Sequence, residues 1–266
     1  MITLAQNQLL KSLPQTALMY HAFHDTDNDW LWSLDFNEFR SHLAMMKLSD
    51  LSVSSVFTDE GVRSKADILL TFDDGYANNS KALELVLKHG YTATLYVVYH
   101  SIGSHSDWQK NREALSLLSM KEIKRFASLG VEIGLHGAYH QDMTAIQPND
   151  LQEQLVAAKS ELENQIGKPV FGLAYPYGRY NKDVMARVRD AGFLYACSTE
   201  AGRVSASLSD YQIKRLTIEN MDTLNRVQRK LILGSNNSSA KALLRYLIKS
   251  VFTPKVNPPS SQGNHL

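Results

Sequence analysis

The sequence contains a single cysteine, few prolines and no long hydrophobic run. Because Cys197 is alone among 266 residues, neither an intramolecular disulfide nor a thiolate metal cage can form. Any metal must therefore be bound by His, Asp or Glu. No run approaches the roughly 18 apolar residues that a membrane span requires, and residues 1–15 lack the pattern of an export signal. These absences predict a cytoplasmic chain.

The overall composition is that of a globular protein. With 44% hydrophobic and 21% charged residues, the chain can bury a large core and is not a disordered, collagenous or coiled-coil protein. The formal net charge is only +1, but residues 212–255 hold nine Lys or Arg against two acids. Two interpretations of this basic segment stay open: a solvated helix face, or a surface that meets an anionic partner. No nucleic-acid partner is expected.

Short apolar runs alternate with longer segments of helical periodicity, which predicts an α/β fold with a mainly parallel sheet. The expected strands cover 16–23, 68–72, 92–98, 131–135, 170–174, 193–198 and 212–218. The expected helices cover 35–48, 78–89, 120–129, 150–166, 182–191, 222–233 and 239–252. Ser119 and Glu122 form a capping box at one helix start, and Gly90, Gly130, Gly167 and Gly192 mark helix ends. Seven strands favour a barrel.

The chain shows no internal repeat and no central linker, so we expect one domain. Its predicted parts are a lead-in over 1–15, the barrel over 16–234, a basic amphipathic helix within 235–253, and a disordered tail over 254–266. The helix has two possible uses. Its apolar face can pack on the barrel, or it can contact an anionic membrane surface and place the protein peripherally at the inner face of the membrane.

Two consecutive carboxylates follow one predicted strand, where the run over 68–72 ends in Asp73, Asp74 and Gly75. Barrel enzymes place their chemistry at the C-terminal ends of strands. Neighbouring side chains there point in different directions, so one Asp can bind a metal while the other faces a substrate. A simple Asp-Gly turn is the alternative.

Two histidines four residues apart, His136 and His140, follow another predicted strand. Neutral imidazole is the commonest transition-metal ligand, and this spacing allows both rings to reach one ion within a helical turn. Two unrelated loop histidines are the alternative. Joined with a carboxylate, they give a three-ligand site with open positions, which is the catalytic arrangement.

A third strand end supplies aromatic rings and a rigid turn suited to forming the wall of a sugar pocket, namely Tyr175, Pro176, Tyr177 and Gly178.

Together these motifs resemble the polysaccharide deacetylases, the NodB-homology group of carbohydrate esterase family 4. TFDDGY at 71–76 matches the first family motif, His136 and His140 fill the second, and 175–178 is similar to the third. The resemblance runs from about residue 17 to 218. It implies a single-domain distorted (β/α) barrel of about seven parallel strands, a divalent metal, usually Zn²⁺, and removal of an N-acetyl group from an amino sugar in a polysaccharide, oligosaccharide or lipid-linked glycan.

The sequence departs from the family pattern at three places. Gly137 stands where the family often has Ser or Thr, so a loop-bracing hydrogen bond is missing. The Arg that usually opens the third motif and steadies the catalytic Asp is replaced by Ala174, and Arg215 is the candidate substitute. The late Leu-x-His motif is absent. His21 resembles the acid of the subgroup that deacetylates poly-N-acetylglucosamine, which supplies this residue from the first strand.

The resemblance implies a role for each residue. Asp74, His136 and His140 would bind the metal, Asp73 would act as general base with Arg215 orienting it, and His21 would act as general acid. For Arg215 a solvated charge, and for His21 a buried ring bonded to a carbonyl, are the structural alternatives. A glycan-binding or scaffold protein without activity is the alternative function. A metal-dependent phosphoesterase would need a second metal or a cationic phosphate clamp that the sequence does not place.

Overall fold

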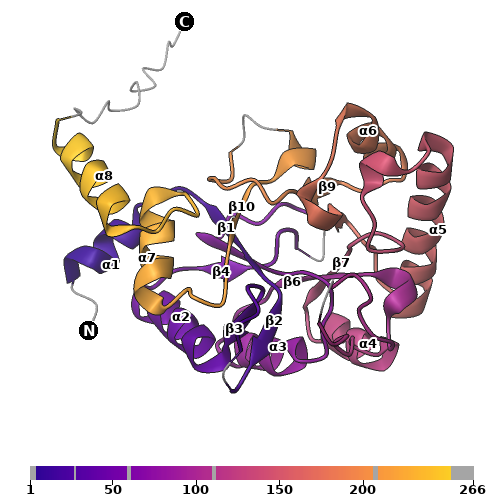
Figure 1. Cartoon of the computed structure of the whole chain (residues 1–266), viewed down its shortest axis with the longest axis horizontal. Coiled ribbons are helices and arrows are strands. Elements are labelled where there is room, and N and C mark those ends of the chain that lie inside the picture. Colours follow the sequence, from indigo (N-terminus) through magenta and orange to yellow (C-terminus); the bar gives the residue numbers. More distant parts are fainter. Residues whose placement is uncertain (1–3, 27, 59–60, 110–111, 206–208, 253–266) are drawn as a thin grey trace, which may run out of the picture.

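A sheet of parallel strands, surrounded by helices, forms the centre of the molecule (Figure 1). The computed structural model describes residues 4–26, 28–58, 61–109, 112–205 and 209–252. Its main sheet consists of β1 (Thr16–Tyr20), β4 (Val53–Ser54), β5 (Ile68–Phe72), β6 (Thr94–Val97), β7 (Glu132–Leu135), β8 (Gly172–Ala174), β9 (Tyr195–Cys197) and β10 (Arg215–Thr217). The α-helices are α1 (Leu4–Lys11), α2 (Phe36–Leu48), α3 (Asn79–Lys88), α4 (Met120–Ser128), α5 (Pro148–Ile166), α6 (Lys182–Asp190), α7 (Leu224–Leu233) and α8 (Ala240–Phe252).

Seven of these strands follow one another as β10-β1-β5-β6-β7-β8-β9, and β4 pairs with β5 beside this path. Every pairing in the path is parallel. A further parallel bridge joins Cys197, at the end of β9, to Ile213, just before β10. The sheet therefore curls into a nearly closed barrel, which confirms the predicted architecture. Parallel strands place all their C-terminal ends on one rim.

The predicted helices and strands are present with slightly different ends, and the strand expected over 16–23 is confirmed only for its first five residues. β1 stops at Tyr20, and β2 (Ala22–His24) pairs instead with β3 (Ser33–Asp35) in a separate small sheet. His21 lies at this break. The expected lead-in contains helix α1, which was not predicted. The capping box of Ser119 and Glu122 is present. The tail expected over 254–266 lies outside the described residues.

The barrel interior contains large polar side chains among apolar ones, and glycines make the room for them. The Tyr96 hydroxyl donates to that of Tyr195 at 3.0 Å, and the Tyr195 hydroxyl in turn donates to Glu132 at 2.8 Å. A Cβ atom at Gly134 would lie 2.4 Å from the Tyr96 ring, and one at Gly172 would lie 2.0 Å from the Tyr195 ring. Both positions therefore have to be glycine for this interior to close.

We predict that Glu132 makes stability depend on pH. Burial raises the pKa of Glu132 from 4.5 to about 7, although the Phe57 N–H and the hydroxyls of Thr94 and Tyr195 donate to it. The folded protein then binds a proton that the unfolded chain releases, so this contribution is complete below pH 4.5 and is lost as the pH rises toward about 7. The loss is about 3 kcal/mol of unfolding free energy.

The measurement is denaturant unfolding of the native protein and Glu132→Gln between pH 4.5 and 8. The stability of the native protein should fall relative to that of the variant as the pH rises. Burial also lowers the pKa of His42, to about 4, but this residue titrates in both proteins and cancels in the difference. A constant difference across this range would show that Glu132 stays ionised in the folded state.

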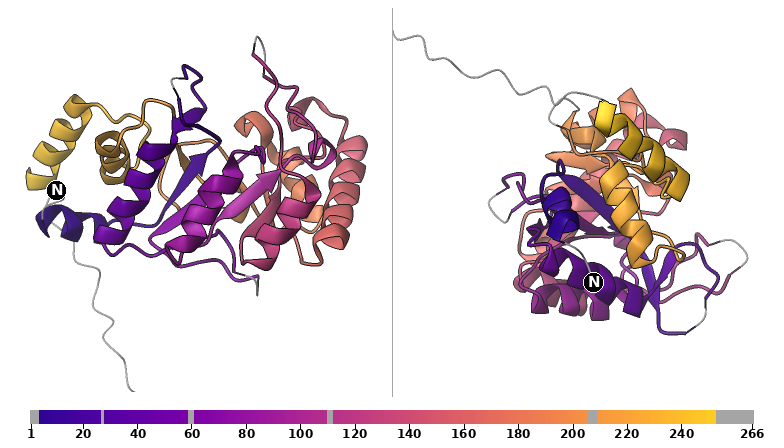
Figure 2. Two further views of the ribbon diagram at one scale, coloured as in Figure 1. Left: turned by 90° about the horizontal axis from the view of Figure 1, so that it is seen from below. Right: turned by 90° about the vertical axis from the view of Figure 1, so that its left-hand side faces the viewer.

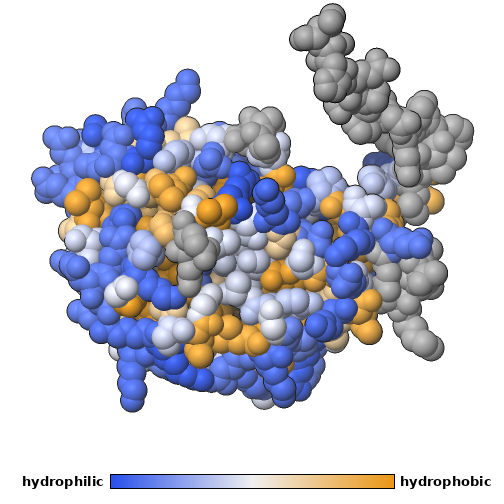
Figure 3. All heavy atoms as spheres, turned by 180° about the vertical axis from the view of Figure 1, so that it is seen from behind, coloured by the Kyte–Doolittle hydropathy of each residue, from blue (hydrophilic) through white to orange (hydrophobic). Residues whose placement is uncertain are grey.

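Helix α8 lies beside α7 at the outer edge of the molecule, at the same end as α1 (Figure 2). Its Leu244 and Ile248 are 60% and 50% exposed. On the face shown in Figure 3, hydrophobic side chains form separate small patches among hydrophilic ones. None of the described helices combines the length and the hydrophobicity needed to cross a membrane.

Candidate active site

Three strand ends deliver the predicted His and Asp residues of the site to one rim of the barrel. His21 follows β1, Asp73 and Asp74 follow β5, and His136 follows β7. The register is continuous across this region, since Tyr20 pairs with Phe72, the residue before Asp73. His21 and His136, which are more than a hundred residues apart in the sequence, therefore converge because β1 and β7 belong to one curled parallel sheet.

Asp74, His136 and His140 form a compact cluster of possible metal ligands. Their ligand atoms all lie within 4.8 Å of one another, and the Asp74 Oδ1 atom is 3.3 Å from the Nε2 atom of each histidine. Asp74 and His136 are buried. Asp74 has a φ of 72°, a left-handed conformation that is strained for a residue with a side chain. Such strain at a cleft-facing carboxylate is typical of a functional position.

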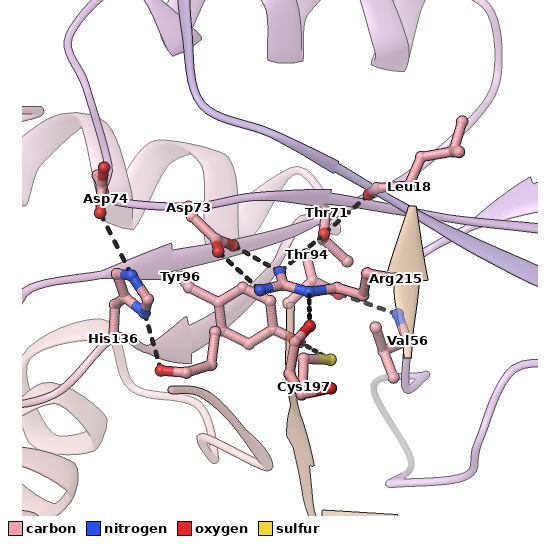
Figure 4. A network of polar contacts seen from close by, with 12 residues as sticks. Leu18, Val56, Thr71, Asp73, Asp74, Thr94, Tyr96, His136, Cys197 and Arg215 are labelled. Atoms are coloured by element: carbon pink, nitrogen blue, oxygen red, sulfur yellow. Dashed lines mark hydrogen bonds and ion pairs between the residues drawn. The ribbon is translucent and has the colours of Figure 1, made fainter. Parts of the chain in front are cut away.

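The cluster fits a divalent cation. The His136 Nδ1 atom is 2.8 Å from the Ala174 carbonyl oxygen, which fixes the ring so that Nε2 faces Asp74 (Figure 4). Within the described residues, the buried Oδ1 of Asp74 has no polar neighbour besides these two imidazole nitrogens and makes no regular hydrogen bond. Burial opposes the Asp74 charge, but the two histidines outweigh it and hold the pKa of Asp74 well below its usual range. One carboxylate oxygen and two imidazole nitrogens are a suitable donor set for a transition metal.

Asp73 faces away from this cluster toward Arg215, on β10. The guanidinium donates two hydrogen bonds, from Nη1 to Oδ1 at 2.6 Å and from Nη2 to Oδ2 at 2.7 Å (Figure 4). Arg215 also donates to the Thr71 hydroxyl and the Ser198 carbonyl, and its side chain is fully buried. Burial by itself raises the pKa of Asp73. The positive charges of Arg215 and His136 lower this pKa by more than burial raises it, so the net shift is downward. The structure thus pairs Arg215 with Asp73 and excludes a solvated charge.

His21 lines the same cleft, and its ring centroid is 4.8 Å from that of Trp32. Its Nδ1 atom is buried and finds no hydrogen-bond partner in the described part of the chain. Burial lowers the pKa of His21, while the carboxylates of Asp74 and Asp73 act in the opposite direction. The ring therefore lines the cleft while its Nδ1 atom is contacted by no polar group of the described residues.

The cleft above these residues has a volume of about 710 Å³ and is open to solvent on one side. All three tryptophans of the chain line it: Trp30, Trp32 and Trp108. No periodic pattern marks these tryptophans in the sequence, because each lies in a loop. Their rarity, together with positions after strand ends, is the signal that was available. Flat aromatic surfaces in an open cleft suit the faces of sugar rings.

The four residues of the third motif divide between lining and shaping the cleft. Tyr175 and Tyr177 line it, the latter 51% exposed. Pro176 is buried and does not line it. Gly178 has a structural role, since a Cβ atom there would lie 1.9 Å from the Thr199 hydroxyl oxygen.

Comparisons with known proteins agree with this geometry. The family model described as polysaccharide deacetylase matches residues 60–196. YxkH of Bacillus subtilis (strain 168) is 24% identical over 208 residues, covering 76% of this chain and 70% of that protein. The poly-β-1,6-N-acetyl-D-glucosamine N-deacetylase of Staphylococcus aureus (strain MRSA252) is 26% identical over 208 residues, covering 70% of this chain and 68% of its own length.

Among solved structures, the Streptococcus pyogenes deacetylase PplD in complex with acetate superimposes with a TM-score of 0.67 at 22% identity, over 79% of this chain and 95% of that one. This likeness supports the fold. Because the family model covers more than half of the sequence, the chain belongs to the polysaccharide deacetylase family. It is accordingly a hydrolase of the class that acts on carbon–nitrogen bonds other than peptide bonds.

Proposed function

We propose that this protein is a metal-dependent deacetylase that removes N-acetyl groups from an amino sugar in a polysaccharide, oligosaccharide or lipid-linked glycan. The observation that carries the proposal is a buried carboxylate, Asp73, fixed by Arg215 beside a separate Asp-His-His cluster in one open cleft. The similarity to the staphylococcal N-deacetylase supports the amino-sugar substrate. Zn²⁺ is the proposed ion, bound by Asp74, His136 and His140, because it suits three such ligands with open positions.

In this mechanism Asp73 is the general base. It accepts a proton from the water whose oxygen attacks the acetyl carbonyl carbon, and Arg215 keeps both carboxylate oxygens in place. When bound, the ion supplies Lewis-acid chemistry, polarising a carbonyl oxygen and making water more acidic. His21 donates a proton to the sugar nitrogen as its bond to carbon breaks, so that acetate and a free amine leave. A backbone N–H near Tyr177 is the proposed donor to the developing oxyanion.

We predict that His21→Ala lowers turnover about a hundredfold, the usual contribution of a general acid. Expulsion of an amine without a proton is very unfavourable, whereas the variant should still bind substrate, so KM should change far less than kcat. Steady-state kinetics of the native protein and the variant measure this. His89→Ala is the matched control, because that ring bonds to the Leu85 carbonyl on α3 and does not line the cleft. Native turnover in His21→Ala would remove this residue from the mechanism.

The decisive test of the proposed function measures bound metal and acetate release together. We expect the purified protein to contain one divalent ion per chain and to release acetate from N-acetylglucosamine oligomers. Removal of the ion with a chelator should abolish release, and addition of Zn²⁺ should restore it. If the metal-loaded protein releases no acetate from oligomers or from acetylated sugar lipids, the alternative of a glycan-binding protein without activity stands.

A separate proposal concerns helix α8. We propose that it contacts an anionic membrane surface, where a lipid-linked glycan would be found. Exposed Leu244 and Ile248 on α8 lie among exposed Lys241 and Arg245, which suits an interfacial helix. Flotation with liposomes containing anionic lipid should recover the full chain but not a chain truncated before Ser239. Equal recovery would contradict the contact. Localisation at the inner membrane face stays a prediction.

A further inference from the structure

The two histidines of the metal cluster are held in different ways. The Nδ1 atom of His136 is fixed by the Ala174 carbonyl at 2.8 Å, the usual second contact of a metal-binding imidazole. The Nδ1 atom of His140 is buried and has no hydrogen-bond partner within the residues that the structure describes. On the Nδ1 side the ring is therefore positioned by packing alone, whereas its Nε2 atom lies 3.3 Å from the Asp74 Oδ1 atom.

Aromatic rings supply that packing. The indole of Trp108 stacks on the His140 ring with centroids 4.5 Å apart and planes inclined by 18°. Tyr177 meets the same imidazole edge-on, also at 4.5 Å. His140 is thus held between a flat surface on one side and a ring edge on another.

The segment that carries Trp108 is itself attached to the histidine loop. Between β6 and α4 the backbone N–H groups of Tyr99 and His100 donate to the carbonyls of Gly137 and Ala138, at 3.2 and 3.0 Å. The His100 ring stacks on Tyr139 with centroids 4.5 Å apart. The segment between β6 and α4 therefore stacks one ring on Tyr139 and another on the next residue, His140.

Gly137 leaves this loop without a side chain at the position that follows His136. Its φ is 83°, and a Cβ atom would lie 2.7 Å from the Tyr139 carbonyl oxygen. A hydroxyl-bearing side chain at this position would require the loop to change its path. Residue 137 therefore supplies no side-chain support for His140.

We propose that Trp108 is a positioning residue that holds His140 for metal binding, in place of a hydrogen bond to Nδ1. The inference rests on the metal site of the proposed function. An imidazole that coordinates a divalent cation becomes electron-poor, and the face of an indole attracts positive charge more strongly than any other side-chain ring. Trp108 therefore stabilises the coordinating state of His140 as well as its orientation.

The test is the affinity of the full chain for Zn²⁺, measured by competition with a chromophoric chelator. Trp108→Leu should weaken Zn²⁺ binding about tenfold, the lower end of what loss of a supporting contact costs. Trp108→Phe should retain most of the affinity, because a phenyl ring can still stack. Trp30→Leu is the matched control: Trp30 lines the same cleft but packs edge-on against Tyr76, so native affinity is expected.

Tryptophan fluorescence gives a second readout. Zn²⁺ should change the emission of the native protein and of Trp30→Phe, and this change should be lost in Trp108→Phe. Native Zn²⁺ affinity in Trp108→Leu, or equal weakening in Trp30→Leu, would overturn the inference. Either result would leave the proposed function intact, since that function fails only if the native metal-loaded protein releases no acetate.

Discussion

Asp73→Asn is expected to reduce acetate release about a thousandfold while leaving the metal bound. An amide has nearly the same shape as the carboxylate but cannot accept the proton of the attacking water, and general-base catalysis contributes about 10² to 10⁴ in rate. Metal content should persist, because Asp73 faces Arg215 rather than the cluster of Asp74, His136 and His140. Acetate release and bound Zn²⁺ are measured on the same preparation.

Asp74→Asn is the matched control for this result. It makes the same carboxylate-to-amide change at the adjacent residue. It should nevertheless weaken metal binding, because Asp74 supplies the carboxylate oxygen nearest to both imidazoles. The two variants should therefore lose activity for different reasons. Substantial turnover by metal-loaded Asp73→Asn would show that another group takes the proton.

The second large effect concerns stability. Arg215→Met should lower the free energy of unfolding by about 3 to 5 kcal/mol, the cost of leaving one member of a buried ion pair without its partner. Arg215 and Asp73 are 0% and 1% exposed, so the two lost hydrogen bonds lie out of contact with bulk solvent. The Ser198 carbonyl and the Thr71 hydroxyl lose a donor in the same variant. Denaturant unfolding at pH 7 measures the change.

A double variant separates charge from packing. If the penalty arises from the unpaired carboxylate, Asp73→Asn combined with Arg215→Met should be more stable than Arg215→Met alone, because the amide carries no charge to bury. Arg215→Lys should restore only part of the stability, since an ammonium group cannot bond both carboxylate oxygens in the same fork. Additive losses in the double variant would show that Arg215 stabilises the barrel independently of Asp73.

Elements that depend on local sequence patterns could be predicted from the sequence. The alternation of apolar runs with helical periodicity located the seven barrel strands, and the Ser119 capping box marked the start of α4. Helix α1 and strand β4 were missed. The former has eight residues and the latter two, lengths at which periodicity carries little information. The break at His21 was also missed, because an apolar run does not show where strand pairing changes.

By itself, the sequence determined the chemistry available to this protein. Its single cysteine cannot form a thiolate metal cage. It places paired carboxylates and paired histidines after apolar strands, and its alternation of strands and helices predicts a barrel that brings the strand ends together. Only the tertiary structure decided which side chains support them. Arg215 bonds Asp73 across 142 positions of the chain, and Trp108 reaches His140 from a loop of another βα unit. Such contacts depend on strand register and on the path of loops through space, neither of which leaves a periodic trace in the sequence.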